Sequence, residues 1–155
     1  MIGLYGLSSK NYALTSSCGA FSSTSVATTY TDITNLSQSL TVCGARPVLI
    51  MLVPDGSSNQ SYVGAYNGTY SVNSRAVAFV VAKRDTTNIA QPLLLTGAQA
   101  STDVDVYQLA PPSSFIFWDW PSAGTYTYKL QAAVDATGMS AEIYYCKMLI
   151  MEVLY

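Results

Sequence analysis

The sequence predicts an all-β protein, an antiparallel sandwich of about eight to ten strands. From Ile33 onward, short segments rich in Val, Ile, Tyr and Thr alternate with Gly, Pro, Asp and Asn at intervals of about ten residues, a spacing typical of such sandwiches. No amphipathic helical period competes with this pattern. The 155 residues fit one domain of ordinary size.

The expected strands follow one another closely, and turn residues mark several of their ends. Asp55-Gly56 ends one strand. Asn67-Gly68, between two tyrosine-bearing segments, is the pair that a two-residue type I′ hairpin prefers, because both central positions need positive φ. The strands are expected at 39–43, 47–53, 61–66, 69–73, 75–83, 88–95, 104–109, 114–118, 124–134 and 141–154.

Two kinds of hydrophobic pattern occur in these strands. Residues 125–130 alternate, with Tyr126, Tyr128 and Leu130 on one face, so one face is buried. By contrast, residues 47–53 and 143–154 are apolar on both faces, and strands of that kind need cover on both sides. Because a two-layer sandwich leaves each sheet with an outer face, we expect a second subunit to cover these strands.

The low charge content also indicates an assembly. Half of the residues are apolar (50%), 10% are charged and none is histidine, whereas a solvated domain usually carries more charge. No basic run offers a surface for phosphates, and no apolar run approaches the roughly 20 residues that span a bilayer. We therefore expect protein partners, with no direct contact to nucleic acid or to a membrane. The first residues lack the basic segment of a signal peptide, so no export is expected.

The first 31 residues are predicted to form an extended N-terminal arm, and the sandwich domain is expected over 32–155. Ser and Thr dominate residues 8–31, with single apolar residues between them. Spaced anchors on a polar backbone fit an arm that docks onto a neighbouring subunit, and they also fit a disordered tail. The residues expected to anchor the arm on its partner are Leu4, Tyr5, Leu7, Tyr12, Leu14 and Phe21.

The residue types present argue against catalysis. Without histidine, nucleophilic catalysis by a histidine base is excluded. Cys18, Cys43 and Cys146 are an odd number without CxxC spacing, which indicates neither a disulfide framework nor a zinc site. We expect reduced, buried thiols, no enzyme activity, no cofactor and no metal.

Residues 115–120 contain the best candidate for contact with a small ligand. Asp119 lies between Trp118 and Trp120, and an exposed tryptophan beside a carboxylate can stack on a sugar ring and accept hydrogen bonds from its hydroxyls. The alternative is that both rings are buried against the opposite sheet or an oligomer axis. Asp119 would then accept a hydrogen bond within its own loop.

The order of four motifs resembles that of compact phage jelly rolls, over residues 33–155. These domains are similar in architecture to the tumour-necrosis-factor fold, a sandwich that forms tight trimers. In phages they occur as capsid cement or decoration proteins, head fibres and receptor-binding fibre tips. The motifs are Gly44-Ala45-Arg46-Pro47-Val48 with Pro54-Asp55-Gly56, Ala78-Phe79-Val80-Val81 with Arg84-Asp85, Asp119-Trp120-Pro121-Ser122-Ala123-Gly124, and a long apolar final strand.

The resemblance implies a homotrimer whose interface uses aromatic faces of the 124–134 strand and the terminal strand. The chain has twelve tyrosines, more than one small core can satisfy through their hydroxyls. The alternative is that these tyrosines fill the core of a monomer. The implied interface residues are Tyr126, Tyr128, Tyr144, Tyr145, Met148 and Ile150.

The implied function is that of a structural virion protein assembled in the host cytoplasm. It would be a trimeric capsid cement or decoration protein that binds the outer capsid surface between major capsid subunits and stabilises the shell. In the implied trimer the three N-terminal arms are the capsid-binding segments. Because they are linked, the second and third arms would bind the capsid at high effective concentration. The alternative is a receptor-binding fibre or head-fibre tip that recognises host surface glycan through Trp118, Asp119 and Trp120.

Overall fold

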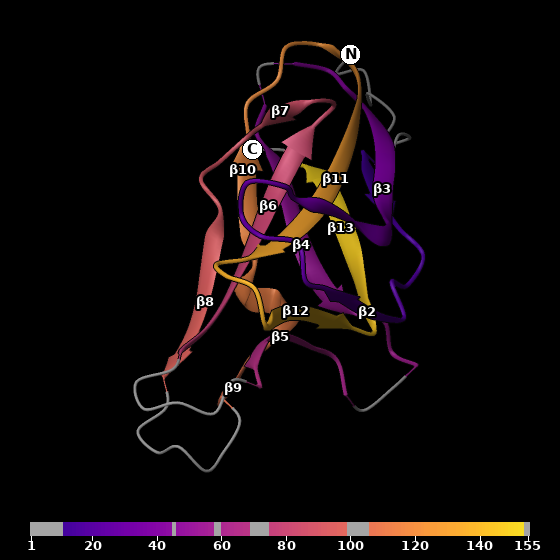
Figure 1. Ribbon diagram of the computed structural model, residues 1–155. Helices are drawn as coiled ribbons and strands as arrows, with labels where there is room; N and C mark the ends of the chain where they lie inside the picture. Colours follow the sequence, from indigo (N-terminus) through magenta and orange to yellow (C-terminus); the bar gives the residue numbers. More distant parts are fainter. Residues whose placement is uncertain (1–10, 45, 58–59, 69–74, 99–105, 154–155) are drawn as a thin grey trace, which may run out of the picture.

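The computed structural model describes residues 11–44, 46–57, 60–68, 75–98 and 106–153 (Figure 1). These residues form strands and one short 3-10 helix, η1 (Pro112–Ser114). The strands are β1 (Tyr12–Leu14), β2 (Ala20–Ser23), β3 (Thr31–Val42), β4 (Val48–Pro54), β5 (Tyr62–Asn67), β6 (Arg75–Arg84), β7 (Thr87–Asn88), β8 (Leu93–Ala98), β9 (Val106–Ala110), β10 (Ile116–Asp119), β11 (Gly124–Val134), β12 (Met139–Tyr144) and β13 (Cys146–Glu152).

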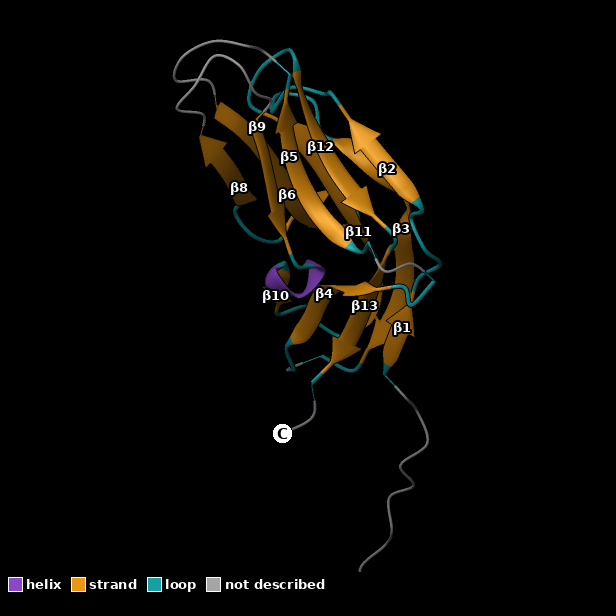
Figure 2. Ribbon diagram, turned by 90° about the horizontal axis from the view of Figure 1, so that it is seen from below, coloured by secondary structure: helices purple, strands orange, loops and turns teal. Residues whose placement is uncertain are grey.

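The strands pack as two layers around one core. One layer is the sheet β3-β11-β6, with β7 and β8 both paired to β6. The other, here called the split layer, consists of two four-stranded sheets, β1-β13-β4-β10 and β2-β12-β5-β9. Figure 2 shows these two half-sheets one beyond the other in front of β6 and β11. The two half-sheets have the same order of strand pairs, so the split layer corresponds to four long strands, each divided in two.

The chain has eight long strands when each divided strand counts once and β7 counts together with β8. In chain order these are β1 with β2, β3, β4 with β5, β6, β7 with β8, β9 with β10, β11, and β12 with β13. The two layers then have the strand orders 1-8-3-6 and 2-7-4-5. Every pairing between the strands is antiparallel. Pairing of the first strand with the last, and of the second with the seventh, is the arrangement of a jelly roll. The predicted antiparallel jelly-roll sandwich is therefore confirmed.

The division of the split layer lies at residues with left-handed backbone conformation. Tyr145, between β12 and β13, has φ 52°, and Gly19, between β1 and β2, has φ 62°. The Tyr145 N–H donates to the Gly19 carbonyl at 2.8 Å, and the Asp55 N–H donates to the Tyr145 carbonyl at 2.9 Å. These hydrogen bonds stabilise the backbone where the split layer divides. Each of the two half-sheets has its own outer face.

The core lies between the two layers and is filled from both. Val48, Ile50 and Leu52 of β4 are fully buried, as are Met148 and Ile150 of β13. Since side chains alternate along a strand, the remaining apolar residues of β4 and β13 lie on the outer face of the split layer.

The described part of the predicted arm belongs to the sandwich. β1 pairs with β13 and β2 pairs with β12, while Val26 forms a parallel bridge with Val134. Phe21 is buried in the core. The predicted domain boundary at residues 31 and 32 is therefore wrong, because residues 12–23 supply the first long strand of the jelly roll. Leu4, Tyr5 and Leu7 lie outside the described residues.

Replacing Gly44 with alanine is expected to lower the free energy of unfolding by more than about 2 kcal/mol. Gly44 has φ +79°, and a Cβ there would lie 2.6 Å from the backbone nitrogen of Ala123. Gly19→Ala is the matched control, because Gly19 also has positive φ but has nothing within 4 Å of a Cβ. Gly19→Ala is expected to lower the free energy of unfolding by about 1 kcal/mol. Urea denaturation measures the free energy of unfolding of both variants. Equal decreases in the two variants would contradict the close approach of Ala123 to Gly44.

Candidate protein-interaction surfaces

The outer face of the half-sheet β1-β13-β4-β10 carries two rows of apolar side chains. In each row, one residue from each strand lies opposite its neighbour in the register. The four residues at the two edges are 42–48% exposed, and the four in the middle are half-buried. The rows, here called the apolar face, are Tyr12, Met151, Leu49 and Trp118, and then Leu14, Leu149, Met51 and Ile116.

The apolar face contrasts with the outer face of the opposite layer. There, Ser39 is hydrogen-bonded to Thr127 at 3.0 Å and Thr41 to Thr125 at 2.8 Å through their hydroxyls. This second face is hydroxylated and suited to water. Soluble monomers rarely expose contiguous apolar patches beyond a few hundred Å². The apolar face therefore has the composition of a protein–protein interface.

Three of the six residues predicted for a trimer interface are buried within their own chain. Tyr128, Met148 and Ile150 are fully buried in the core, so the prediction is wrong for them. Tyr126, Tyr144 and Tyr145 are half-buried at the surface. On β13 the side chains that reach the surface are instead those of Lys147, Leu149 and Met151, which alternate with the buried residues.

The remaining described anchors of the predicted arm take different positions. Tyr12 is 46% exposed and Leu14 is 48% exposed, and both lie at one edge of the apolar face. Phe21 is 8% exposed and packs in the core, so it is not available to a neighbouring subunit. The interpretation of Phe21 as a docking anchor is therefore wrong.

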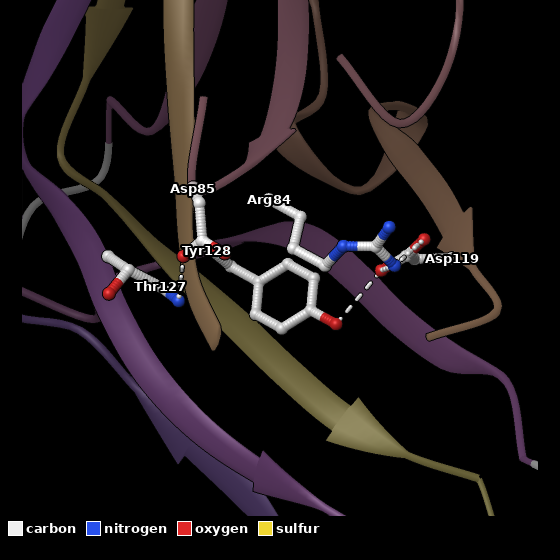
Figure 3. Close-up of polar contacts among 5 residues, drawn as sticks. All are labelled: Arg84, Asp85, Asp119, Thr127 and Tyr128. Carbon is white, nitrogen blue, oxygen red and sulfur yellow. Dashed lines mark hydrogen bonds and ion pairs between the residues drawn. The ribbon is translucent and has the colours of Figure 1, made fainter. Parts of the chain in front are cut away.

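Asp119 is turned away from the two tryptophans beside it. Its carboxylate is 7% exposed and accepts hydrogen bonds from Arg84 Nη1 at 2.9 and 3.0 Å and from the Tyr128 hydroxyl at 2.9 Å (Figure 3). The Arg84 guanidinium also lies 5.1 Å from the centre of the Tyr126 ring. Burial, with the bond to Asp119, raises the pKa of the Tyr128 hydroxyl. The prediction that Asp119 contacts a sugar is therefore wrong, because its carboxylate anchors β10 to β6 and β11.

Both tryptophans are exposed in the single chain, so the prediction of burial against the opposite sheet is wrong, while burial at an oligomer axis stays a prediction. Trp118 is 42% exposed and belongs to the apolar face, while Trp120 lies just beyond β10 and is 70% exposed. Their ring centres are 6.3 Å apart, with the planes tilted by 32°. Trp120 thus extends the apolar face beyond Trp118 at its β10 edge.

The outer face of the other half-sheet, β2-β12-β5-β9, carries tyrosines around one carboxylate. Glu142 Oε2 accepts hydrogen bonds from the hydroxyls of Tyr62, at 3.2 Å, and Tyr107, and these two hydroxyls are 3.0 Å apart. Burial, together with the bond to Glu142, raises the pKa of the Tyr107 hydroxyl. We call this surface the tyrosine patch, and its residues are Tyr62, Tyr66, Tyr107, Leu109, Glu142 and Tyr144.

The rings of the tyrosine patch support one another. Tyr107 meets Tyr62 and Tyr66 edge to face, with ring centres 6.4 and 5.7 Å apart. Tyr144 lies 4.8 Å from Tyr62. Of these residues, sequence reasoning named Tyr144 alone. The others come together through the pairing of β5 with β9 and β12, which no local signal reveals.

The cysteines are free in the structure, and two of them adjoin each other. The Cys18 N–H donates to the Cys146 carbonyl at 2.9 Å. Both side chains are buried, and contact with the Cys18 thiol, together with burial, raises the pKa of the Cys146 thiol. Cys43 is exposed, so the expectation of burial is wrong for this residue.

The described residues give two further findings. Among them no helix has both the length and the apolar character needed to cross a membrane. Within the same ranges, His, Cys, Asp and Glu side chains do not form a group of three or more that could hold a metal ion.

No protein-family model matches the chain, and no curated protein matches it. Among solved structures, the chain is similar at 10% identity to that of infectious bursal disease virus Gx strain, with a TM-score of 0.26, over 90% of this chain and 37% of the other. The structure of infectious bursal virus derived T=1 particles is similar at 9% identity, with a TM-score of 0.26, over 95% of this chain and 37% of the other.

The VP2 subviral particle of infectious bursal disease virus gives 14% identity and a TM-score of 0.21, over 99% of this chain and 42% of the other. The chain thus spans about two fifths of the length of each of these proteins. At these TM-scores the likeness carries no weight for fold or function. The jelly-roll assignment follows from the sheet topology itself.

Proposed function

We propose that the chain is a structural virion protein, a homotrimeric capsid cement or decoration protein. It binds the outer capsid surface between major capsid subunits and stabilises the shell, acting by association and without turnover. The observation that carries this proposal is the apolar face, which spans all four strands of one half-sheet. A face of this composition needs permanent protein cover.

Apolar burial on the scale of a standard interface is enough to hold an oligomer together. A standard interface buries about 800 Å² on each partner, and the roughly 1,600 Å² in total corresponds, at about 25 cal/mol per Å², to on the order of 40 kcal/mol if all of that area is apolar. Association costs roughly 4–15 kcal/mol in lost freedom of movement. Burial on this scale therefore exceeds the cost of bringing copies together.

The two edges of the apolar face carry different side chains, and the proposed trimer joins one edge of each copy to the other edge of the next. The β10 edge carries Trp118 and Ile116, with Trp120 beyond it, and the β1 edge carries Tyr12 and Leu14. A contact of one edge with the other edge of the next copy is heterologous, and such contacts form a ring where the rotation between copies closes and an open filament where it does not. Three copies are the smallest ring of this kind.

The native mass of the purified protein, combined with its copy number per virion, tests the proposal. We expect three times the chain mass of 16.6 kDa and a copy number comparable with that of the major capsid protein. A freely soluble single chain at micromolar concentration would rule out the trimer and, with it, the cement function.

A second candidate function is a receptor-binding fibre tip that recognises host surface glycan. The observation that favours it is the exposure of Trp120, at 70%, with the Trp118 ring beside it. A glycan array with Trp120→Ala discriminates the two, because Trp120 lies outside the two rows of the apolar face. Specific glycan binding that Trp120→Ala abolishes would favour the fibre tip, and a low copy number per virion would agree with it.

A further inference from the structure

We propose that the tyrosine patch is a second, reversible docking surface, and that its partner presents an arginine or lysine to Glu142. The inference rests on the proposed function and identifies this surface as the one that binds the major capsid protein. It gives the two half-sheets different partners, a second copy of this chain for the apolar face and the capsid for the tyrosine patch.

The composition of the two faces separates their roles. The two rows of the apolar face contain no charged residue, as is typical of interfaces that form once and stay closed. The tyrosine patch combines aromatic rings and hydroxyls with one carboxylate. Tyrosine is enriched at interfaces between proteins that also exist apart, because its ring is apolar and its hydroxyl remains compatible with water.

The carboxylate of Glu142 is held in place before any partner binds. Glu142 lies opposite Gly64 in the register, and Gly64 lies opposite Leu109. A Cβ on Gly64 would lie 3.2 Å from both Leu109 Cδ2 and Tyr62 Cε2, so these side chains close over the glycine. With two tyrosine hydroxyls donating to its Oε2, the carboxylate has a fixed position, which lowers the entropic cost of binding.

Glu142 has no cationic partner among the residues that the structure describes. The ion pairs there join Arg75 to Asp135, Arg84 to Asp119 and Lys129 to Asp32. Its Oε1 atom accepts no hydrogen bond from any described residue. Covering an unpaired carboxylate with protein is unfavourable unless the partner supplies a positive charge. Arginine fits best, since a guanidinium can stack on a tyrosine ring while it donates to the carboxylate.

The same charge argues against a second copy of this chain as the occupant. A two-fold contact between tyrosine patches would bring two Glu142 side chains near each other without a cation, and like charges oppose such a contact. A flat sugar platform is also disfavoured, because Tyr107 meets its neighbours edge to face and not in one plane.

Binding of the trimer to undecorated capsids of the virus that encodes the chain tests the inference. Cosedimentation is measured for the wild type, Glu142→Gln and Tyr107→Phe at several salt concentrations. Glu142→Gln is expected to weaken binding about tenfold or more and to reduce its salt dependence, with unchanged native mass. Tyr107→Phe removes one donor to the carboxylate and is expected to weaken binding by a smaller factor. Asp135→Asn, the same change of charge away from the patch, is the matched control and is expected to bind as the wild type.

The outcomes separate this inference from the proposed function. Wild-type binding that Glu142→Gln leaves unchanged would overturn the inference and leave the cement function standing. A wild-type trimer that does not bind capsids would overturn both. Binding of neutral saccharides on a glycan array, abolished by Tyr107→Ala in the absence of capsid binding, would assign the patch to a sugar and also overturn the inference.

Discussion

Replacing Leu149 with glutamate is expected to dissociate the proposed trimer into single chains. Leu149 lies in the middle of the apolar face, between Leu14 and Met51 in the register. An unpaired charge buried in an interface costs about 3–5 kcal/mol, so the dissociation constant is expected to rise by at least about a hundredfold. Light scattering over a range of protein concentrations measures the change in mass.

The matched control places the same charge on the opposite side of the molecule. Ser39 is on the outer face of β3, where its hydroxyl is bonded to that of Thr127. Ser39→Glu is expected to leave the native mass unchanged, because that face remains in water. A Leu149→Glu protein that keeps the wild-type mass would show that the apolar face is not where the copies meet.

Replacing Asp119 with asparagine is expected to lower the free energy of unfolding by about 2–4 kcal/mol. The carboxylate is 7% exposed and neutralises Arg84, whose side chain is 27% exposed. Without it, a half-buried guanidinium has no counter-charge, and the Tyr128 hydroxyl loses a charged acceptor. Chemical denaturation at a fixed protein concentration measures the loss.

Asp135→Asn serves as the control for this prediction. Asp135 pairs with Arg75 near the surface, where the two side chains are 32% and 63% exposed. Exposed ion pairs stabilise by at most about 1 kcal/mol, so a small loss is expected here. Equal losses for the two variants would mean that the bond of Asp119 to Arg84 stabilises no more than a surface pair does.

The sequence was informative wherever strands were regular and bounded by turns. The strand expected at 124–134 corresponds to β11, Gly124–Val134, and the one at 47–53 lies one residue before β4 at both ends. The need to cover the outer face of two doubly apolar strands follows from the same patterns. What these patterns could not give is the phase of such strands, since either set of alternate residues could be buried. The trimer residues Met148 and Ile150 were misplaced for this reason.

An irregular strand explains why residues 31–38 were not predicted as part of a strand. The strand β3 runs from Thr31 to Val42, but its buried residues Ile33 and Leu36 are three apart. Asn35 has φ 62°, and the register with β11 is irregular at the same place. A bulge of this kind shifts the alternation, so the period of two that identifies a strand is lost.

The strand expected at 69–73, which would complete the hairpin expected at Asn67-Gly68, lies outside the described residues. β5 lies between β9 and β12 and pairs with both. Both pairings join segments that are distant in the sequence, and no local signal reveals them. The tyrosine patch was missed for a related reason, because its side chains are brought together by contacts between distant segments.

The pairing of β1 with β13 determines how the protein could carry a mechanical load. Tyr12 lies opposite Met151, at the end of a short antiparallel edge pair. Tension from a tether attached beyond these two residues would open the pair one hydrogen bond at a time, whereas shear along the strands would load all bonds together. This edge pair therefore resists a force directed along the two strands better than a force that pulls their ends apart.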